Sequence, residues 1–231
     1  MALPANRCRR HRAQRGAGGI SAICGTSHSY GTRPRRLDLD EDVKNNSSHF
    51  GWFCAQGETQ AMQELHRNEQ YFFDRATLRH LSRFVASFLN PCCLCAPLLG
   101  RELSEQGVQV TILDIDERFA PVAGFRRFDI YRPEWIDEKF GLIVCDPPFF
   151  NVSLSQLYAA LRLLSQFDYN QRLLISYLTR RSSNLLGTFA SFNLSPTGYF
   201  PSYQTVDNAE RNQIEFFSNL SDDFLGKLRT V

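Results

Sequence analysis

The 231-residue sequence lacks several features that would assign it to a particular class of protein. It has no apolar run that approaches the roughly 18 residues a membrane-spanning helix needs, so we expect a soluble protein with no membrane association. No secretory signal precedes its seven cysteines, an odd number, which favours reduced thiols and a cytoplasmic location. With 43% hydrophobic and 22% charged residues, the composition predicts one globular domain with a sizeable core.

A second pair of metal ligands is also lacking. Cys92-x-x-Cys95 has the spacing of half a zinc site, but no other Cys-x-x-Cys and no matching pair of histidines occurs in the sequence. Cys93 lies between these two cysteines and leucines follow them, which favours small, buried apolar residues on a first strand. We therefore expect no metal.

Acidic residues are absent from residues 1–36, which contain eight arginines. Because the whole chain has a formal charge of +2, residues 37–231 carry a formal charge of −6. A basic segment with few large apolar residues cannot bury enough surface to fold. We predict a disordered basic tail and linker over 1–58 and a folded domain over 59–231. The tail also resembles a transit peptide for the mitochondrion or chloroplast, and it also fits an arm that contacts nucleic acid or an upstream extension that is not part of the working protein.

From residue 59 onward, apolar runs alternate with segments of helical period. Leu78, Leu81, Val85 and Phe88 recur at spacings of three and four, which predicts an amphipathic helix over 75–89 with Asp74 as its N-cap. Further helices are expected at 101–106, 153–165 and 182–189, and strands or apolar runs at 94–98, 108–113, near Phe128, and at 142–145, 173–177, 198–200 and 214–217. This alternation predicts an α/β fold with a Rossmann-like, mostly parallel sheet and helices on both of its faces.

Acidic residues follow three of the expected strands. Asp114 or Asp116, Asp129 and Asp146 each lie at or just beyond the carboxyl end of a strand, the edge at which doubly wound folds bind ligands. Each one alone is most simply a helix cap or a turn residue. Together they favour a binding site, in which the acid after the second strand is placed to accept the hydroxyls of a ribose.

The sequence Asp146-Pro147-Pro148-Phe149 directly follows the apolar run 142–145. Two prolines with fixed φ make the turn after the strand rigid. They leave a carboxylate, a carbonyl and an aromatic ring at the end of the strand. We call this four-residue segment the amine ledge, because its carboxylate and the Pro147 carbonyl can each accept one N–H of a flat, amine-bearing substrate.

The amine ledge, with its preceding strand, resembles motif IV of the S-adenosylmethionine-dependent amino-methyltransferases. The order of several segments is similar, more narrowly, to the probable N6-adenine methyltransferase family, whose eukaryotic members include translation elongation factor lysine methyltransferases. The resemblance covers about residues 70–220. Its segments are 71–73, 95–97, 113–119, 128–131, 146–149 and 212–219.

The resemblance implies a seven-stranded Rossmann-like methyltransferase fold and S-adenosyl-L-methionine as cofactor. The catalytic residues implied are Asp146, Pro147, Pro148 and Phe149. The cofactor-binding residues implied are Ala96 and Pro97 by backbone contact, Asp114 and Asp116 at the ribose, and Asp129 and Ile130 at the adenine edge. The substrate-binding residues implied are Tyr71, Phe72, Phe73 and Phe150. One departure concerns the loop after the first strand, which is glycine-rich in most such enzymes, whereas residues 92–100 retain only Gly100.

The identity of the acceptor stays open between two polymers. A lysine must lose its proton before it attacks, and a neighbouring carboxylate opposes that loss, whereas the adenine amine is already neutral. This favours N6 of adenine in DNA or RNA. The acidic charge of residues 37–231 instead favours a basic protein, such as a translation factor methylated on lysine. A third reading is a pseudo-methyltransferase that binds partners without catalysis.

Overall fold

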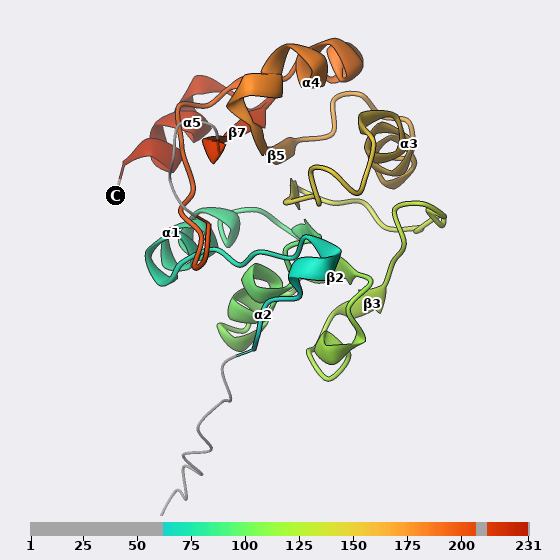
Figure 1. Ribbon diagram of the computed structural model, residues 1–231, viewed down its shortest axis with the longest axis vertical. Helices are drawn as coiled ribbons and strands as arrows, with labels where there is room; N and C mark the ends of the chain where they lie inside the picture. The colour runs from blue at the N-terminus through green and yellow to red at the C-terminus, as the bar shows by residue number, and fades with distance from the viewer. Residues whose placement is uncertain (1–61, 207–211, 231) are drawn as a thin grey trace, which may run out of the picture. The chain divides into compact units, whose positions relative to one another are not determined.

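The computed structural model describes residues 62–206 and 212–230, shown in colour in Figure 1. The predicted tail and linker over 1–58 and the domain start at residue 59 lie outside the described residues. The described part forms a seven-stranded sheet with strand order β3-β2-β1-β4-β5-β7-β6. The strands are β1 (Cys92–Leu94), β2 (Thr111–Asp114), β3 (Phe125–Arg127), β4 (Ile143–Cys145), β5 (Leu173–Leu178), β6 (Ser195–Pro196) and β7 (Ile214–Ser218).

Five of the strands are parallel, and β7 runs antiparallel to both β5 and β6. The order reverses direction between β1 and β4, so the carboxyl ends of these two strands border the crevice in which open α/β sheets bind ligands. The predicted Rossmann-like, mostly parallel sheet is therefore confirmed.

Helices cover both faces of the sheet (Figure 1). The helices are α1 (Arg75–Val85), α2 (Pro97–Glu105), α3 (Leu154–Leu164), α4 (Ser182–Thr188) and α5 (Asp222–Arg229). One core cluster joins α1, α2 and α5 to strand residues such as Cys93 and Val144, and a second joins α3 and α4 to their neighbours Cys92 and Cys145. Successive strand residues thus enter opposite cores, which explains why the central strands β1 and β4 are apolar and buried along their whole length.

Local signals set the starts of two helices. The Asp74 carboxylate accepts the backbone N–H of Thr77 at 2.7 Å, which confirms Asp74 as the N-cap of α1. Ser153 and Gln156 form a reciprocal capping box at the start of α3. Each cap satisfies N–H groups that the first helical turn leaves without an intrahelical partner.

Several predicted boundaries were wrong. The run 94–98 is not a strand, because β1 ends at Leu94 and Pro97 begins α2. A proline is favoured at the first helical position, where its missing N–H costs nothing. The strand expected at 198–200 is displaced to β6, and α1 ends at Val85 instead of continuing to residue 89. The strand expected near Phe128 ends one residue earlier, at Arg127. The C-terminal helix α5 was not predicted.

Gly124 and Gly141 occupy positions that no other residue fits. Gly124 has φ of +85°, and a Cβ built there would lie 2.0 Å from the Val110 carbonyl oxygen. A Cβ at Gly141 would lie 2.2 Å from the Leu89 carbonyl oxygen, at the entry to β4. Close backbone approach of this kind explains both glycines. Within the described residues, no helix is long and apolar enough to cross a bilayer.

Candidate active site

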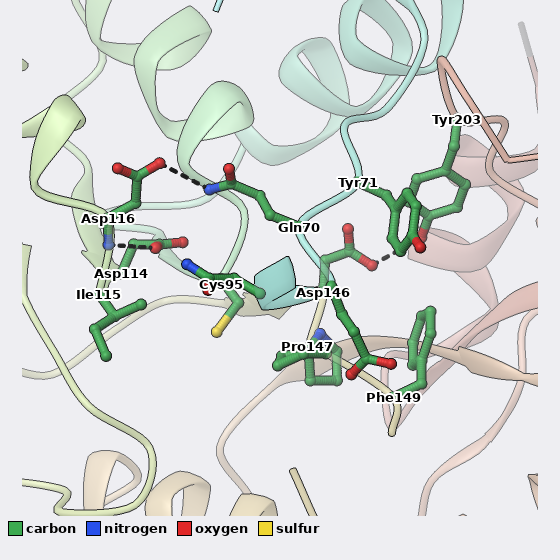
Figure 2. Close-up of a pocket in the computed structure, with 13 residues that line it drawn as sticks. Gln70, Tyr71, Cys95, Asp114, Ile115, Asp116, Asp146, Pro147, Phe149 and Tyr203 are labelled. Carbon is green, nitrogen blue, oxygen red and sulfur yellow. Dashed lines mark hydrogen bonds between the residues drawn. The ribbon is translucent and has the colours of Figure 1, made fainter. Parts of the chain in front are cut away.

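A pocket at the carboxyl ends of β1, β2 and β4 brings the amine ledge and the acid after β2 into one site (Figure 2). The carboxyl ends of neighbouring parallel strands lie at the same edge of the sheet, which explains why residues distant in sequence meet here. The pocket is lined by Asn68, Glu69, Gln70, Tyr71, Cys95, Asp114, Ile115, Asp116, Asp146, Pro147, Pro148, Phe149 and Tyr203.

Asp146 is held by two hydroxyl groups that bond to the same oxygen atom. Tyr203 donates its hydroxyl to Oδ1 at 2.7 Å, as Figure 2 shows, and the Ser176 hydroxyl donates to the same Oδ1. Oδ2 receives no hydrogen bond from the part of the chain that the structure describes. The carboxylate is therefore fixed in orientation and presents one oxygen as an acceptor.

Burial sets the protonation of this pair of side chains. It raises the pKa of Asp146 to about 7, although the hydrogen bonds from Ser176 and Tyr203 favour the charged form. Burial and the nearby Asp146 raise the pKa of Tyr203 well above its usual range, so this phenol remains a hydrogen-bond donor. A carboxyl group that titrates near neutral pH within a pocket is typical of a functional site.

Aromatic rings surround the amine ledge. The Phe149 ring packs edge-to-face against Tyr177, with centroids 5.6 Å apart and an interplanar angle of 84°. Tyr71 and Tyr203 line the same pocket. These rings give the space beside Asp146 flat, apolar walls, the kind of surface on which a planar group stacks.

Glu69 holds the turn that follows the ledge. Its Oε2 accepts the backbone N–H of Phe150 at 3.0 Å and that of Asn151 at 2.6 Å. Glu69 itself has φ of 51°, a left-handed conformation that is uncommon for a residue with a side chain. On the far side of the turn, the Tyr131 hydroxyl donates to the Asn151 carbonyl. The turn is therefore pinned from two sides.

The two acids after β2 have different partners. Asp116 accepts from Arg118 at 2.6 Å and from Gln70 at 3.0 Å, with both of its oxygens engaged. Burial alone would raise the pKa of Asp116, but the hydrogen bonds from Arg118 and Gln70 lower it. Asp114 accepts the backbone N–H of Asp116 at 2.8 Å, and burial raises the pKa of Asp114 to about 6. Asp116 is thus tied into a structural network, and Asp114 faces the pocket.

The turn after β1 adopts a left-handed backbone conformation without a glycine. Cys95 adopts φ of 55° and its N–H donates to the Leu113 carbonyl at 2.9 Å. Burial, with Asp114 nearby, raises the pKa of the Cys95 thiol well above its usual range. The thiol is therefore protonated and packs at the pocket edge. Farther along α2, Gly100 lies so close to Ile112 that a Cβ would approach its side chain to 2.5 Å, which permits close helix–strand packing.

A second cavity continues past Ile115 to the end of β3. Asp129 and Ile130, the residues predicted to border the adenine of the cofactor, line it together with Ile115, Cys95 and Pro148. Ile115, Cys95 and Pro148 also line the pocket that contains Asp146. The predicted ribose, adenine and amine positions thus adjoin one another along the strand ends.

Four predicted contact residues do not line the pocket: two lie in the core and two lie at the start of α2. Phe72 is 2% exposed and packs edge-to-face on Phe119, and Phe73 is 3% exposed and packs on Tyr203. Neither ring lines the pocket and both belong to the core, so their role in substrate binding stays a prediction. The side chains of Ala96 and Pro97 are buried at the start of α2, and their backbone contact with the cofactor likewise stays a prediction.

Of the residues predicted to bind substrate, Tyr71 lines the pocket and Phe150 lies beyond it on the surface. Sequence reasoning missed Glu69, Gln70, Cys95 and Ser176 as site residues. No local pattern marks these residues, because their roles depend on long-range contacts. Among the described residues, no three His, Cys, Asp or Glu side chains gather as metal ligands would.

One comparison with known proteins identifies the family of this chain. The family model described as probable N6-adenine methyltransferase matches residues 64–222. A comparison with curated proteins found no match. Similar solved structures include a putative RNA methyltransferase from Pyrococcus horikoshii, at 13% identity and a TM-score of 0.48, covering 68% of this chain and 88% of that one. Magnesium protoporphyrin IX methyltransferase from Synechocystis PCC 6803 is 12% identical with a TM-score of 0.45, covering 62% and 77%.

Proposed function

We propose that this chain, which belongs to the probable N6-adenine methyltransferase family and is an S-adenosylmethionine-dependent methyltransferase, methylates the N6 amine of adenine in nucleic acid. The observation that carries the proposal is the single acceptor oxygen of Asp146, fixed in a pocket with aromatic walls. A planar ring with an exocyclic amine complements that arrangement.

The residues at the strand ends fit the cofactor of the family. Asp114 would accept the ribose hydroxyls, and Asp129 with Ile130 would border the adenine ring, in the cavity that adjoins the ledge. The close backbone turn at Cys95 leaves room for a ligand at the carboxyl end of β1. When bound, S-adenosylmethionine supplies a methyl group on a positively charged sulfur.

The amine ledge then orients the acceptor. Oδ2 of Asp146 and the Pro147 carbonyl each accept one N–H of the amine, so that the nitrogen lone pair points away from both. Phe149 stacks on the base. Methyl transfer is an in-line displacement, so most of the catalytic advantage comes from this orientation. In a duplex the target base must first leave the helix to reach the ledge.

The charge state of the amine favours adenine over lysine. The adenine amine is neutral at physiological pH and attacks without losing a proton first. A lysine ammonium beside ionised Asp146 would be stabilised in its charged, unreactive form. Lysine remains the second candidate because residues 37–231 have a formal charge of −6, which would attract a basic protein.

Labelled methyl donor, incubated with the protein and a cell lysate, tests the acceptor. After separate digestion with nuclease and protease, we expect the label to be lost to nuclease and to survive protease. The opposite pattern would refute adenine in favour of lysine. Asp146→Ala should abolish this labelling, while calorimetry shows cofactor binding largely unchanged, because the proposed bonds of Asp146 go to the amine alone.

A further inference from the structure

Phe150 and Arg180, which are exposed, and Arg181, which is half-buried, form a group beside the amine ledge that we call the rim patch. Phe150 directly follows the ledge and its side chain is 60% exposed. The guanidinium carbon of Arg181 lies 4.9 Å from the centre of the Phe150 ring, and that of Arg180 lies 5.8 Å from it. An exposed ring and two cations thus share one small surface, although residues 37–231 as a whole have a formal charge of −6.

The rim patch is held in place by bonds to the backbone. The Phe150 N–H is bonded to Glu69, which also holds the next residue. Arg181 donates to the carbonyl of Phe149 at 3.3 Å. The Glu69 carboxylate brings a negative charge close by, but two backbone N–H groups already share its Oε2. The patch therefore lies in a fixed position relative to the ledge, as a preorganised binding surface requires.

Phe150 also lines a cavity of about 230 Å³ that adjoins the active site. Tyr71 and Phe149 line both this cavity and the pocket that contains Asp146. Leu178 and Ile214 supply further apolar walls, and the remaining lining residues are Thr205, Val206 and Asn212. A mostly apolar space lined by three aromatic rings, next to two cations, has the chemistry of a site for one nucleobase and its phosphate.

We propose that the rim patch binds the nucleotide adjacent to the target adenine in a single strand. The neighbouring base stacks beside Phe150 in the cavity, and the intervening phosphate lies against Arg180 and Arg181. This inference rests on the proposed function, because it presumes a nucleic acid in the active site. A single strand fits better than a duplex, since stacking on a protein ring requires an unstacked base.

Charge complementarity favours a phosphate over a basic protein surface at the rim patch. Guanidinium groups pair with phosphate through two parallel hydrogen bonds, and they repel the lysine-rich surface that a basic protein substrate would present. An acidic peptide is the competing occupant. It would complement the charge of the arginines but would leave the Phe150 ring and the adjoining cavity without a planar partner.

Fluorescence anisotropy with a short, labelled RNA that contains one adenine among pyrimidines tests the proposal. We expect Phe150→Ala to weaken binding about tenfold and Phe150→Trp to restore it, as loss and recovery of one stacked base would. Arg180→Ala should reduce the slope of log K against log salt by about 0.7, the value for one phosphate contact on a single strand. The matched control is Phe167→Ala, since Phe167 is 51% exposed and has Arg162 at 5.3 Å but lies away from the site.

The same RNA, tested for methylation by the wild-type protein, separates the two proposals. If the RNA is methylated while Phe150→Ala binds it as tightly as Phe167→Ala does, the proposed role of the rim patch in nucleotide binding is refuted. The assignment of adenine as the acceptor then stands. If Phe150→Ala weakens binding but the adenine is never methylated, the assignment of the acceptor fails instead. Equal displacement of the RNA by an acidic peptide of the same charge would also overturn the nucleotide site.

Discussion

Methyl transfer should depend on pH through Asp146. Oδ1 of this residue already accepts two hydroxyl groups, from Ser176 and Tyr203, so a proton added to the carboxylate must reside on Oδ2. Oδ2 is the oxygen that we propose accepts the N–H of the amine. Protonation therefore converts the proposed acceptor into a donor directed at the N–H groups it should receive, and the productive orientation of the amine is lost.

The size of the expected change in rate with pH follows from the pKa of Asp146. Burial raises the pKa of Asp146 from 3.8 to about 7, so the carboxylate is about 90% ionised at pH 8 and about 10% ionised at pH 6. We expect kcat/KM, which reports groups of the free enzyme, to fall roughly tenfold between these two pH values. A lysine acceptor would instead give a rate that continues to rise above pH 8, because the amine itself must deprotonate.

The assay is the initial rate of methylation at subsaturating nucleic acid, from pH 5.5 to 9, for the wild type and for Asp146→Asn. The asparagine keeps the shape of the side chain but has no proton to lose in this range. Its rate should be low and flat. A wild-type profile without a step near pH 7, or the same step in Asp146→Asn, would show that Asp146 is not the titrating group.

Three other substitutions probe separate parts of the site and fold. Glu69→Ala should lower kcat about tenfold with unchanged cofactor affinity, because the turn after the ledge loses both of its bonds; an equal loss of cofactor affinity would contradict this. Asp114→Asn should weaken cofactor binding about tenfold by calorimetry, and unchanged affinity would remove Asp114 from the cofactor site. Gly124→Ala should lower the free energy of unfolding in urea by about 3 kcal/mol or more, because its Cβ would meet a carbonyl oxygen. The control is Gly187→Ala, which has open space around its Cβ and should raise the free energy of unfolding by up to about 1 kcal/mol.

Features fixed by local chemistry could be predicted from the sequence. The cap at Asp74 needs only a carboxylate three residues before an N–H group, and the parallel order of the strands follows from alternating apolar and helical segments. The boundary at Pro97 could not be predicted from apolarity, since the run 94–98 continues without a polar break while the backbone changes from strand to helix. Short apolar runs carry no information on which of the two they form.

The aromatic run 71–73 shows a different limit. Its three rings are chemically alike, yet Tyr71 lines the pocket while Phe72 and Phe73 enter the core. Which ring is exposed depends on a bridge between Phe73 and Tyr203, two residues far apart in sequence. Composition alone therefore identifies the segment near the substrate but not the residue that contacts it.

The acids at the strand ends show the same limit for chemical roles. Sequence places Asp114 and Asp116 equally well at the cofactor, and only the contacts of Arg118 and Gln70 with Asp116 separate them. In the same way, sequence places Asp146 at the ledge, but Tyr203 and Ser176 decide which of its oxygens remains an acceptor. A carboxylate becomes useful here when its partners leave one lone pair available in a defined direction. The ledge residues thus specify the type of acceptor group, and partners contributed by β5 and by the segment before β7 specify its orientation.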